Sequence, residues 1–141
     1  MQPSSTDDLL KKLLRTDEYT QFQADAEGDL QVPSLTEHLN ELLIEKKRTR
    51  AEVIATCNLD KTYGYQIFQG IRQPTRDKLL QLAFGFPLTY QETIKMLRIA
   101  GVGTLYPKRK RDSIIIFALH KRLTMQQLST LLAEEGEAYL A

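Results

Sequence analysis

The chain has 141 residues, 42% of them hydrophobic, and a formal net charge of +1, which suits one domain, or one domain with an extension, that buries a core. Its single cysteine, Cys57, excludes an internal disulfide framework and a cysteine-clustered zinc site, and no apolar run approaches the length of a membrane span. No secretory signal is visible, so we expect a cytoplasmic protein without a membrane partner.

Charge is distributed unevenly along the chain. Residues 1–45 carry 3 basic and 10 acidic side chains, whereas residues 46–122 carry 16 basic and 5 acidic ones, and the last 19 residues add three glutamates. A basic block of this size is typical of a nucleic-acid binder, because contacts to phosphates supply most non-specific affinity. Without a supporting motif, the same block would fit a solvated surface equally well.

Residues 1–32 are predicted to form an acidic N-terminal extension with one or two short helices. Thr6 or Asp7 can cap the first helix. That helix carries a stripe of four leucines: Leu9, Leu10, Leu13 and Leu14. We expect the stripe to pack on the main domain; the alternatives are a dimer contact and an acidic arm that shields the basic face. After Thr16 the pattern weakens into an acidic loop.

Residues 33–101 are predicted to form a helical domain whose helices are marked by capping residues. In a capping box, two side chains three residues apart each bond the backbone N–H of the other residue, which satisfies donors that the first helical turn leaves free. Four pairs have this spacing along the chain: Ser34 and Glu37, Thr49 and Glu52, Thr89 and Glu92, and Thr124 and Gln127. Asp60 and Thr75 are predicted as further caps.

Residues 49–70 are predicted to form two short helices joined by a tight turn, and the rest of the domain is organised around them. Asn58 tolerates the left-handed backbone conformation that would end the first helix, and we expect Leu59 to enter the core at the turn. The second helix begins after Asp60 and is closed by Gly70.

In this order the residues resemble the lambda-repressor-like helix-turn-helix family of DNA-binding domains, also called the XRE or Cro/repressor family. The resemblance covers residues 35–97 and rests on eleven positions: Thr49, Glu52, Asn58, Leu59, Asp60, Ile67, Gly70, Pro74, Leu79, Leu82 and Ala83. It implies a five-helix domain in which the helix from Asp60 to Gln69 enters the DNA major groove. A set of short bacterial XRE-type proteins also looks similar over nearly the whole chain.

Two positions depart from the family pattern. Ile54 stands where the family usually has alanine, and Gly64 stands where it usually has isoleucine or valine. If the two positions face each other, the large and the small residue have been exchanged and the core volume is roughly kept. Gly64 would still cost about 1 kcal/mol of helix propensity.

The resemblance implies roles for eight side chains. Those that read bases would be Lys61, Thr62, Gln66 and Tyr65, because lysine donates to guanine, glutamine pairs with adenine and the threonine methyl contacts the thymine methyl. Those that hold phosphates would be Arg50, Arg72, Arg76 and Lys47. Arg76 also stands near a helix N-terminus, where the dipole disfavours a cation, and this suggests an anionic partner. The alternative is a helical face that is merely polar.

Residues 102–141 are predicted to form a helical hairpin that is extra to the family domain. A loop with four cations, Lys108 to Arg111, precedes a helix that Asp112 is expected to cap. The apolar run 114–119 is too wide for a surface stripe, so the hairpin is predicted either to extend the core or to form a dimer interface. The four cations form either a second phosphate contact or a solvated loop.

The sequence therefore predicts an all-α fold: a five-helix lambda-repressor-like domain with an N-terminal helical extension and the C-terminal hairpin. The predicted function is a sequence-specific double-stranded DNA-binding transcription regulator, a repressor that acts as a homodimer on a symmetric site. The alternative is an adaptor of the same fold that binds a protein through the acidic segment or the hairpin. We expect no enzyme, cofactor or metal, because His38, His120 and Cys57 have no supporting spacing, and Cys57 is predicted to be a core residue.

Overall fold

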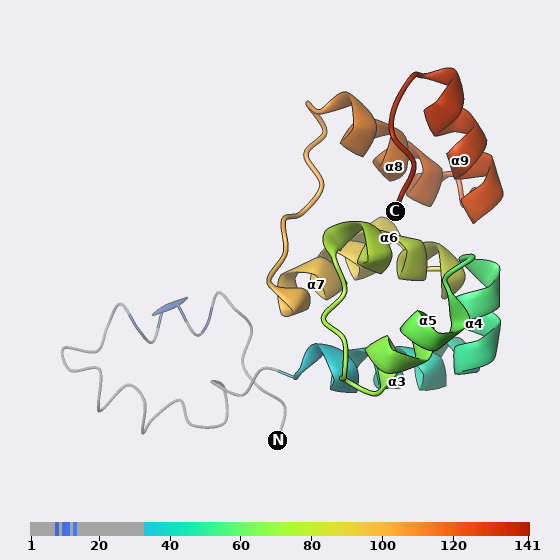
Figure 1. Cartoon of the computed structure of the whole chain (residues 1–141). Coiled ribbons are helices and arrows are strands. Elements are labelled where there is room, and N and C mark those ends of the chain that lie inside the picture. Colours follow the sequence, from blue (N-terminus) through green and yellow to red (C-terminus); the bar gives the residue numbers. More distant parts are fainter. Residues whose placement is uncertain (1–7, 9, 12, 14–32) are drawn as a thin grey trace. The chain divides into compact units, whose positions relative to one another are not determined.

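The computed structural model describes residues 33–141, together with residues 8, 10, 11 and 13 (Figure 1). The chain divides into two compact units, residues 1–33 and residues 34–141. Most of the predicted N-terminal extension, including its acidic loop, lies outside the described residues. Of the predicted leucine stripe, Leu10 and Leu13 are described, and both are helical and exposed.

Residues 34–141 are folded as helices and connecting turns, with no strand in this part of the chain, which confirms the all-α class for the described residues. The helices are α3 (Leu35–Lys46), α4 (Arg50–Thr56), α5 (Lys61–Phe68), α6 (Arg76–Gly85), α7 (Tyr90–Ala100), α8 (Lys110–His120) and α9 (Met125–Glu134). Each of these helices is too short or too polar to span a bilayer.

Most of these helices begin at the predicted capping residues. Six side chains accept a hydrogen bond from the backbone N–H three residues further on: Ser34, Thr49, Asp60, Thr75, Thr89 and Thr124. Both halves of the capping box form at α4, α7 and α9. These bonds satisfy N–H groups that have no partner within their own helix, so the caps fix where each helix starts.

The start of α8 differs from the prediction. The N-cap residue is Arg109, whose side chain makes no capping bond, so the expected Asp112 cap is wrong. Asp112 is instead 3% exposed, and its Oδ2 accepts from the backbone N of Tyr106 (2.9 Å) and from Nη2 of Arg76 in α6 (2.7 Å). A buried carboxylate requires such charged and polar partners, and here they tie the loop before α8 to α6.

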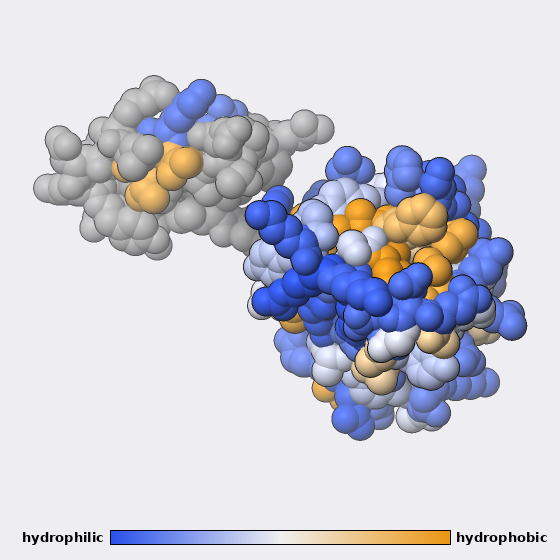
Figure 2. All heavy atoms as spheres, turned by 90° about the horizontal axis from the view of Figure 1, so that it is seen from above, coloured by the Kyte–Doolittle hydropathy of each residue, from blue (hydrophilic) through white to orange (hydrophobic). Residues whose placement is uncertain are grey.

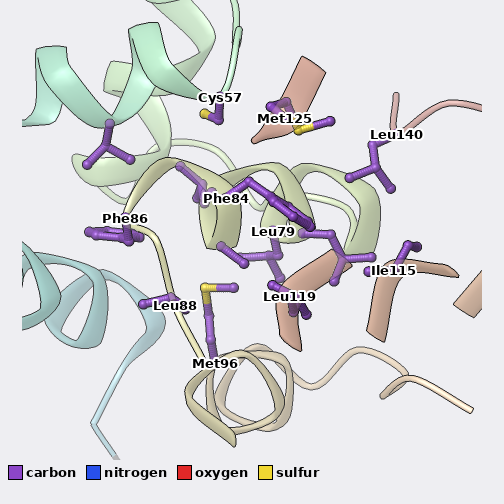
Figure 3. Packing of buried hydrophobic residues seen from close by; sticks show 14 of the residues in the cluster. Cys57, Leu79, Phe84, Phe86, Leu88, Met96, Ile115, Leu119, Met125 and Leu140 are labelled. Carbon is purple, nitrogen blue, oxygen red and sulfur yellow. The ribbon is translucent and has the colours of Figure 1, made fainter. Parts of the chain in front are cut away.

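Helix α6 lies at the centre of the core. Every residue from Leu79 to Phe86 is buried, and α4, α7 and α9 all contact this helix. Helix α4 approaches it closely at Gly85, where an added Cβ atom would stand 2.6 Å from the carbonyl oxygen of Val53. Figure 3 shows α6 side chains among residues of α7, α8 and α9: Leu79, Phe84, Met96, Ile115, Leu119 and Met125.

The hairpin formed by α8 and α9 contributes to this core. Its buried side chains belong to the same apolar cluster as those of α6: Ile114, Ile115, Ala118, Leu119, Met125, Leu128 and Leu132. The apolar run of α8 therefore lies largely in the core, which agrees with the first of the two predicted roles of the hairpin, an extension of the core. Phe117 is the exception in that run, since it is 49% exposed.

Candidate nucleic-acid interface

Helices α4 and α5 are joined by a turn over residues 57–60. Asn58 adopts the predicted left-handed conformation, with φ of 58°, and Leu59 is 7% exposed, as expected for a residue that enters the core. The backbone N of Leu59 donates to the carbonyl of Ile54 (3.2 Å), which closes the end of α4. The turn therefore sets the direction in which α5 leaves α4.

Helix α5 has a buried face and an accessible face. Gly64, Ile67 and Phe68 are buried against the rest of the fold. All four predicted base-reading residues lie on this helix: Lys61 and Thr62 are exposed, whereas Gln66 and Tyr65 are half-buried. The structure thus gathers the predicted base readers on one short helix, with its two N-terminal side chains the most accessible.

Arg72 lies against α5, although it follows that helix in the sequence. Gly70, with φ of 78°, turns the chain back, and the backbone N of Arg72 donates to the carbonyl of Gln66 (3.3 Å). The Arg72 Nε then donates to Gln66 Oε1 (3.0 Å), and its guanidinium carbon stands 5.4 Å from the centre of the Tyr63 ring. The family resemblance implied a phosphate contact for Arg72 and gave no sign of this contact with Gln66, a predicted base reader.

A second cation shares the Tyr63 ring. The Nζ of Lys78, at the start of α6, stands 5.5 Å from the ring centre. A cation within about 6 Å of an aromatic face is attracted to it, so both side chains gain by lying there. Tyr63 is half-buried and holds two positive charges beside α5.

Arg50 joins α4 to α3 and α5. Its Nη2 donates to Oδ1 of Asn40 (2.9 Å), whose Nδ2 donates in turn to the carbonyl of Phe68 (3.1 Å). The guanidinium carbon also stands 5.9 Å from the Phe68 ring centre. Lys47 is exposed and ends α3 in the left-handed conformation, with φ of 54°. The structure thus fixes the position of Arg50 and leaves Lys47 accessible.

Arg76 already has anionic and carbonyl acceptors within the chain. It donates to the carbonyls of Gly103 (3.1 Å) and Thr104 (3.0 Å) and pairs with Asp112 (2.7 Å). The anionic partner that its position at a helix N-terminus suggested is therefore found in the fold itself. Its contact with a phosphate stays a prediction.

The cations from Lys108 to Arg111 do not form a uniform solvated loop. Arg111 makes a two-pronged ion pair with Asp77, with N–O distances of 3.1 and 2.8 Å, and it also donates to the carbonyls of Ala138 and Tyr139. Lys110 donates to the carbonyl of Glu135 (2.8 Å). Both residues contact the C-terminal segment: Arg111 is largely withdrawn from solvent, whereas Lys110 stays exposed, as expected for a solvated cation.

An apolar hollow of about 300 Å³ lies beside the residues predicted to read bases. Its lining comes from α4, the turn and α5: Ala51, Ile54, Ala55, Leu59, Lys61 and Tyr65. Tyr65 is half-buried where it lines this hollow. Such a surface suits a methyl group or another small apolar partner.

The titratable residues Cys57 and His38 lie inside the fold. Cys57 is 0% exposed, which confirms it as a core residue, and burial raises the pKa of its thiol to about 11. His38 is 7% exposed, and burial, helped by Lys95, lowers the pKa of its imidazole. Among the described residues, no group of three or more histidine, cysteine, aspartate or glutamate side chains is placed to hold a metal ion.

Comparison with family models, curated proteins and solved structures found no match to this chain. The resemblance to the lambda-repressor-like family therefore rests on the quoted residues alone.

Proposed function

We propose that the protein is a sequence-specific double-stranded DNA-binding transcription regulator, a repressor that reads the major groove with the helix from Asp60 to Gln69. The observation that carries the proposal is the division of α5 into a buried face and an accessible face. Its inner face is buried, and its accessible face presents Lys61, Thr62 and Gln66. A short helix held against a core in this way is the usual element for reading base edges in the major groove.

Each of these side chains suits a particular base. Lys61 can donate to guanine O6 or N7, and Gln66 can pair with adenine through both its carbonyl and its amide nitrogen. Thr62 offers a methyl group to thymine, and Tyr65, half-buried on the same helix, is proposed to contact a neighbouring base edge. Lys47 caps the end of α3 and Arg50 is the first residue of α4, and both are proposed to hold the phosphates.

The positive charge of residues 46–122 supports an anionic partner. Four of their sixteen cations form ion pairs with carboxylates: Lys46, Arg76, Lys110 and Arg111. The other twelve have no carboxylate within 4 Å in the part of the chain that the structure describes. The surplus charge is thus mostly available to attract phosphates, a contribution that salt would weaken.

A salt titration of duplex binding tests this function. Affinity is measured for a mixed-sequence duplex and for the region upstream of the protein's own gene, with the wild type, Lys61→Ala and Gln66→Ala. Lys121→Ala, which removes an exposed charge at the end of α8, is the matched control. We expect log K to fall with log salt by about 0.9 per phosphate contact, and the two α5 variants to lose preference while keeping non-specific binding. Absence of duplex binding at low salt would overturn the proposal.

The alternative function is a protein-binding adaptor. One feature of the hairpin suits either the partner of such an adaptor or a dimer contact of the regulator. Phe117 is 49% exposed and borders a hollow of about 580 Å³ with Leu123 and Leu131. Figure 2 shows apolar surface among polar side chains on the face of residues 34–141 that it displays. A homodimer formed through the hollow beside Phe117 would double the DNA half-sites, whereas an adaptor would bind a protein with little salt dependence.

A further inference from the structure

Arg72 is held to α5 by its backbone as well as by its side chain. The turn at Gly70 lets the backbone N–H groups of both Ile71 and Arg72 donate to the carbonyl of Gln66, at 3.0 and 3.3 Å. The side chain then returns to the same residue, since its Nε donates to Gln66 Oε1 at 3.0 Å. Two residues that are six apart in the sequence are thereby joined at one point of the candidate interface.

This contact orders both side chains before any ligand binds. An exposed arginine or glutamine normally loses rotamer entropy when it is fixed. Here the bond to Gln66 and the Tyr63 ring, 5.4 Å from the guanidinium carbon, already restrict Arg72. Gln66 is restricted in turn, because rotating its amide by a half-turn would place its NH₂ group against the Arg72 donor. The pair therefore presents defined donors and acceptors.

The remaining donors of the pair match two base edges. The Arg72 Nη atoms have no hydrogen-bond partner among the described residues, and a pair of such donors matches O6 and N7 of guanine. Gln66 keeps its Nε2 donors and one lone pair on Oε1, which is the combination that adenine requires. A phosphate also fits the two Nη donors, but it would make no use of the bond to Gln66.

We propose that Arg72 is a specificity-determining residue: together with Gln66 it reads two adjacent base pairs, with guanine recognised by Arg72, and it also positions the Gln66 amide. This inference rests on the proposed function, because it names the bases that the same interface recognises. It replaces the phosphate-holding role that the sequence pattern suggested for Arg72.

Substitutions at Arg72 separate base reading from phosphate contact. A preferred duplex is first selected from a random pool with the wild-type protein, and affinities for it and for a mixed duplex are then measured with Arg72→Ala and Arg72→Lys. We expect both variants to lose about 5- to 150-fold in preference, the range for one two-pronged base contact. Lysine keeps the charge, so it should restore non-specific affinity without restoring preference.

A double-mutant cycle tests whether the two residues act together. Gln66→Ala and Arg72→Ala combined should cost no more preference than the worse single variant, because each removes the same unit. Lys78→Ala is the matched control: it removes a charge beside the Tyr63 ring but does not touch Gln66 in the structure, so it should weaken binding to both duplexes alike. Thermal melts of every variant report whether it is folded.

The outcomes distinguish this inference from the function on which it depends. If Arg72→Ala weakens both duplexes equally and reduces the salt slope by about one contact, Arg72 holds a phosphate and the inference is overturned while the function stands. Additive losses in the cycle would also overturn the paired reading. If the wild type binds no duplex at low salt, the proposed function and this inference both fall.

Discussion

Gly64 in α5 lies directly against Ile54 in α4: a Cβ atom added at Gly64 would stand 2.7 Å from Cγ1 of Ile54 and 2.8 Å from its Cδ1. The two positions that depart from the family pattern therefore face each other, which meets the condition under which a large and a small residue have been exchanged. The isoleucine fills the space that a side chain on α5 would otherwise occupy, so the two substitutions depend on each other.

The effect of Gly64→Ala should change sign with the residue at position 54. In the wild-type background the new methyl group overlaps Ile54, and we expect a loss of about 1–3 kcal/mol in the free energy of unfolding. In an Ile54→Ala background the space is free, and the same change should stabilise by up to about 1 kcal/mol through helix propensity. Urea unfolding of the four proteins measures both effects. Equal effects in the two backgrounds would show that the residues are not in contact.

Features that depend on nearby residues were predictable from the sequence. The capping boxes at Thr49 and Thr89 form as expected, because each requires only two suitable side chains three residues apart. The left-handed conformations of Asn58 and Gly70 follow from what those residue types tolerate. These local signals placed α4, α5 and their turn, and hence the accessible face of α5.

Contacts between distant residues were not predictable. Asp112 has the sequence context of a helix cap. Its carboxylate instead forms a buried ion pair with Arg76, which lies 36 residues earlier. The pairing of Arg72 with Gln66 was missed for a different reason. Residues six apart lie on different faces of a continuous helix, and only the reversal at Gly70 brings them together.

The ion pair of Arg111 with Asp77 is expected to stabilise the C-terminal segment. Arg111→Ala removes a two-pronged bond to Asp77 and two bonds to carbonyls of that segment, so it should cost about 1.5–3 kcal/mol in the free energy of unfolding at pH 7. Lys110→Ala is the control, because its ion pair with Glu135 is solvent-exposed and should contribute less than about 1 kcal/mol. Equal losses for the two variants would contradict this assignment.

The same pair should make stability fall at acid pH. Burial alone would raise the pKa of Asp77, but the hydrogen bond and charge of Arg111 outweigh it, and the pKa lies below its ordinary value. A lowered pKa gives a stabilisation that is complete above about pH 4 and is lost as the pH falls through the folded-state value. The difference between the wild type and Arg111→Ala should therefore shrink between pH 7 and pH 3 in urea unfolding. A difference that stays constant with pH would exclude the link.

Cys57 should react with thiol reagents only when the turn after α4 opens. Burial raises its pKa to about 11, so on the order of one thiol in a thousand would be ionised at pH 8 even if reagent had access. We expect the native protein to react at least roughly 100-fold more slowly than the urea-unfolded chain. A chromogenic disulfide measures both rates, and Cys57→Ala should give no signal. Comparable rates in the two states would mean that the α4 end is open in the native protein.

His38 should make stability depend on pH in a higher range than Asp77 does. Burial, followed by the charge of Lys95, lowers its pKa, although Glu41 and Glu45 oppose the shift. The unfolded chain then binds the proton more readily than the folded one, so stability should fall as the pH drops through about 6.5, by at most about 1.4 kcal/mol per pH unit. His38→Gln should remove this slope between pH 7.5 and 5, whereas His120→Gln, at an exposed position, should keep it. Each variant removes one imidazole, so the two differ only in whether that imidazole is buried. If both variants lose the slope, or if neither does, the burial of His38 is not its source.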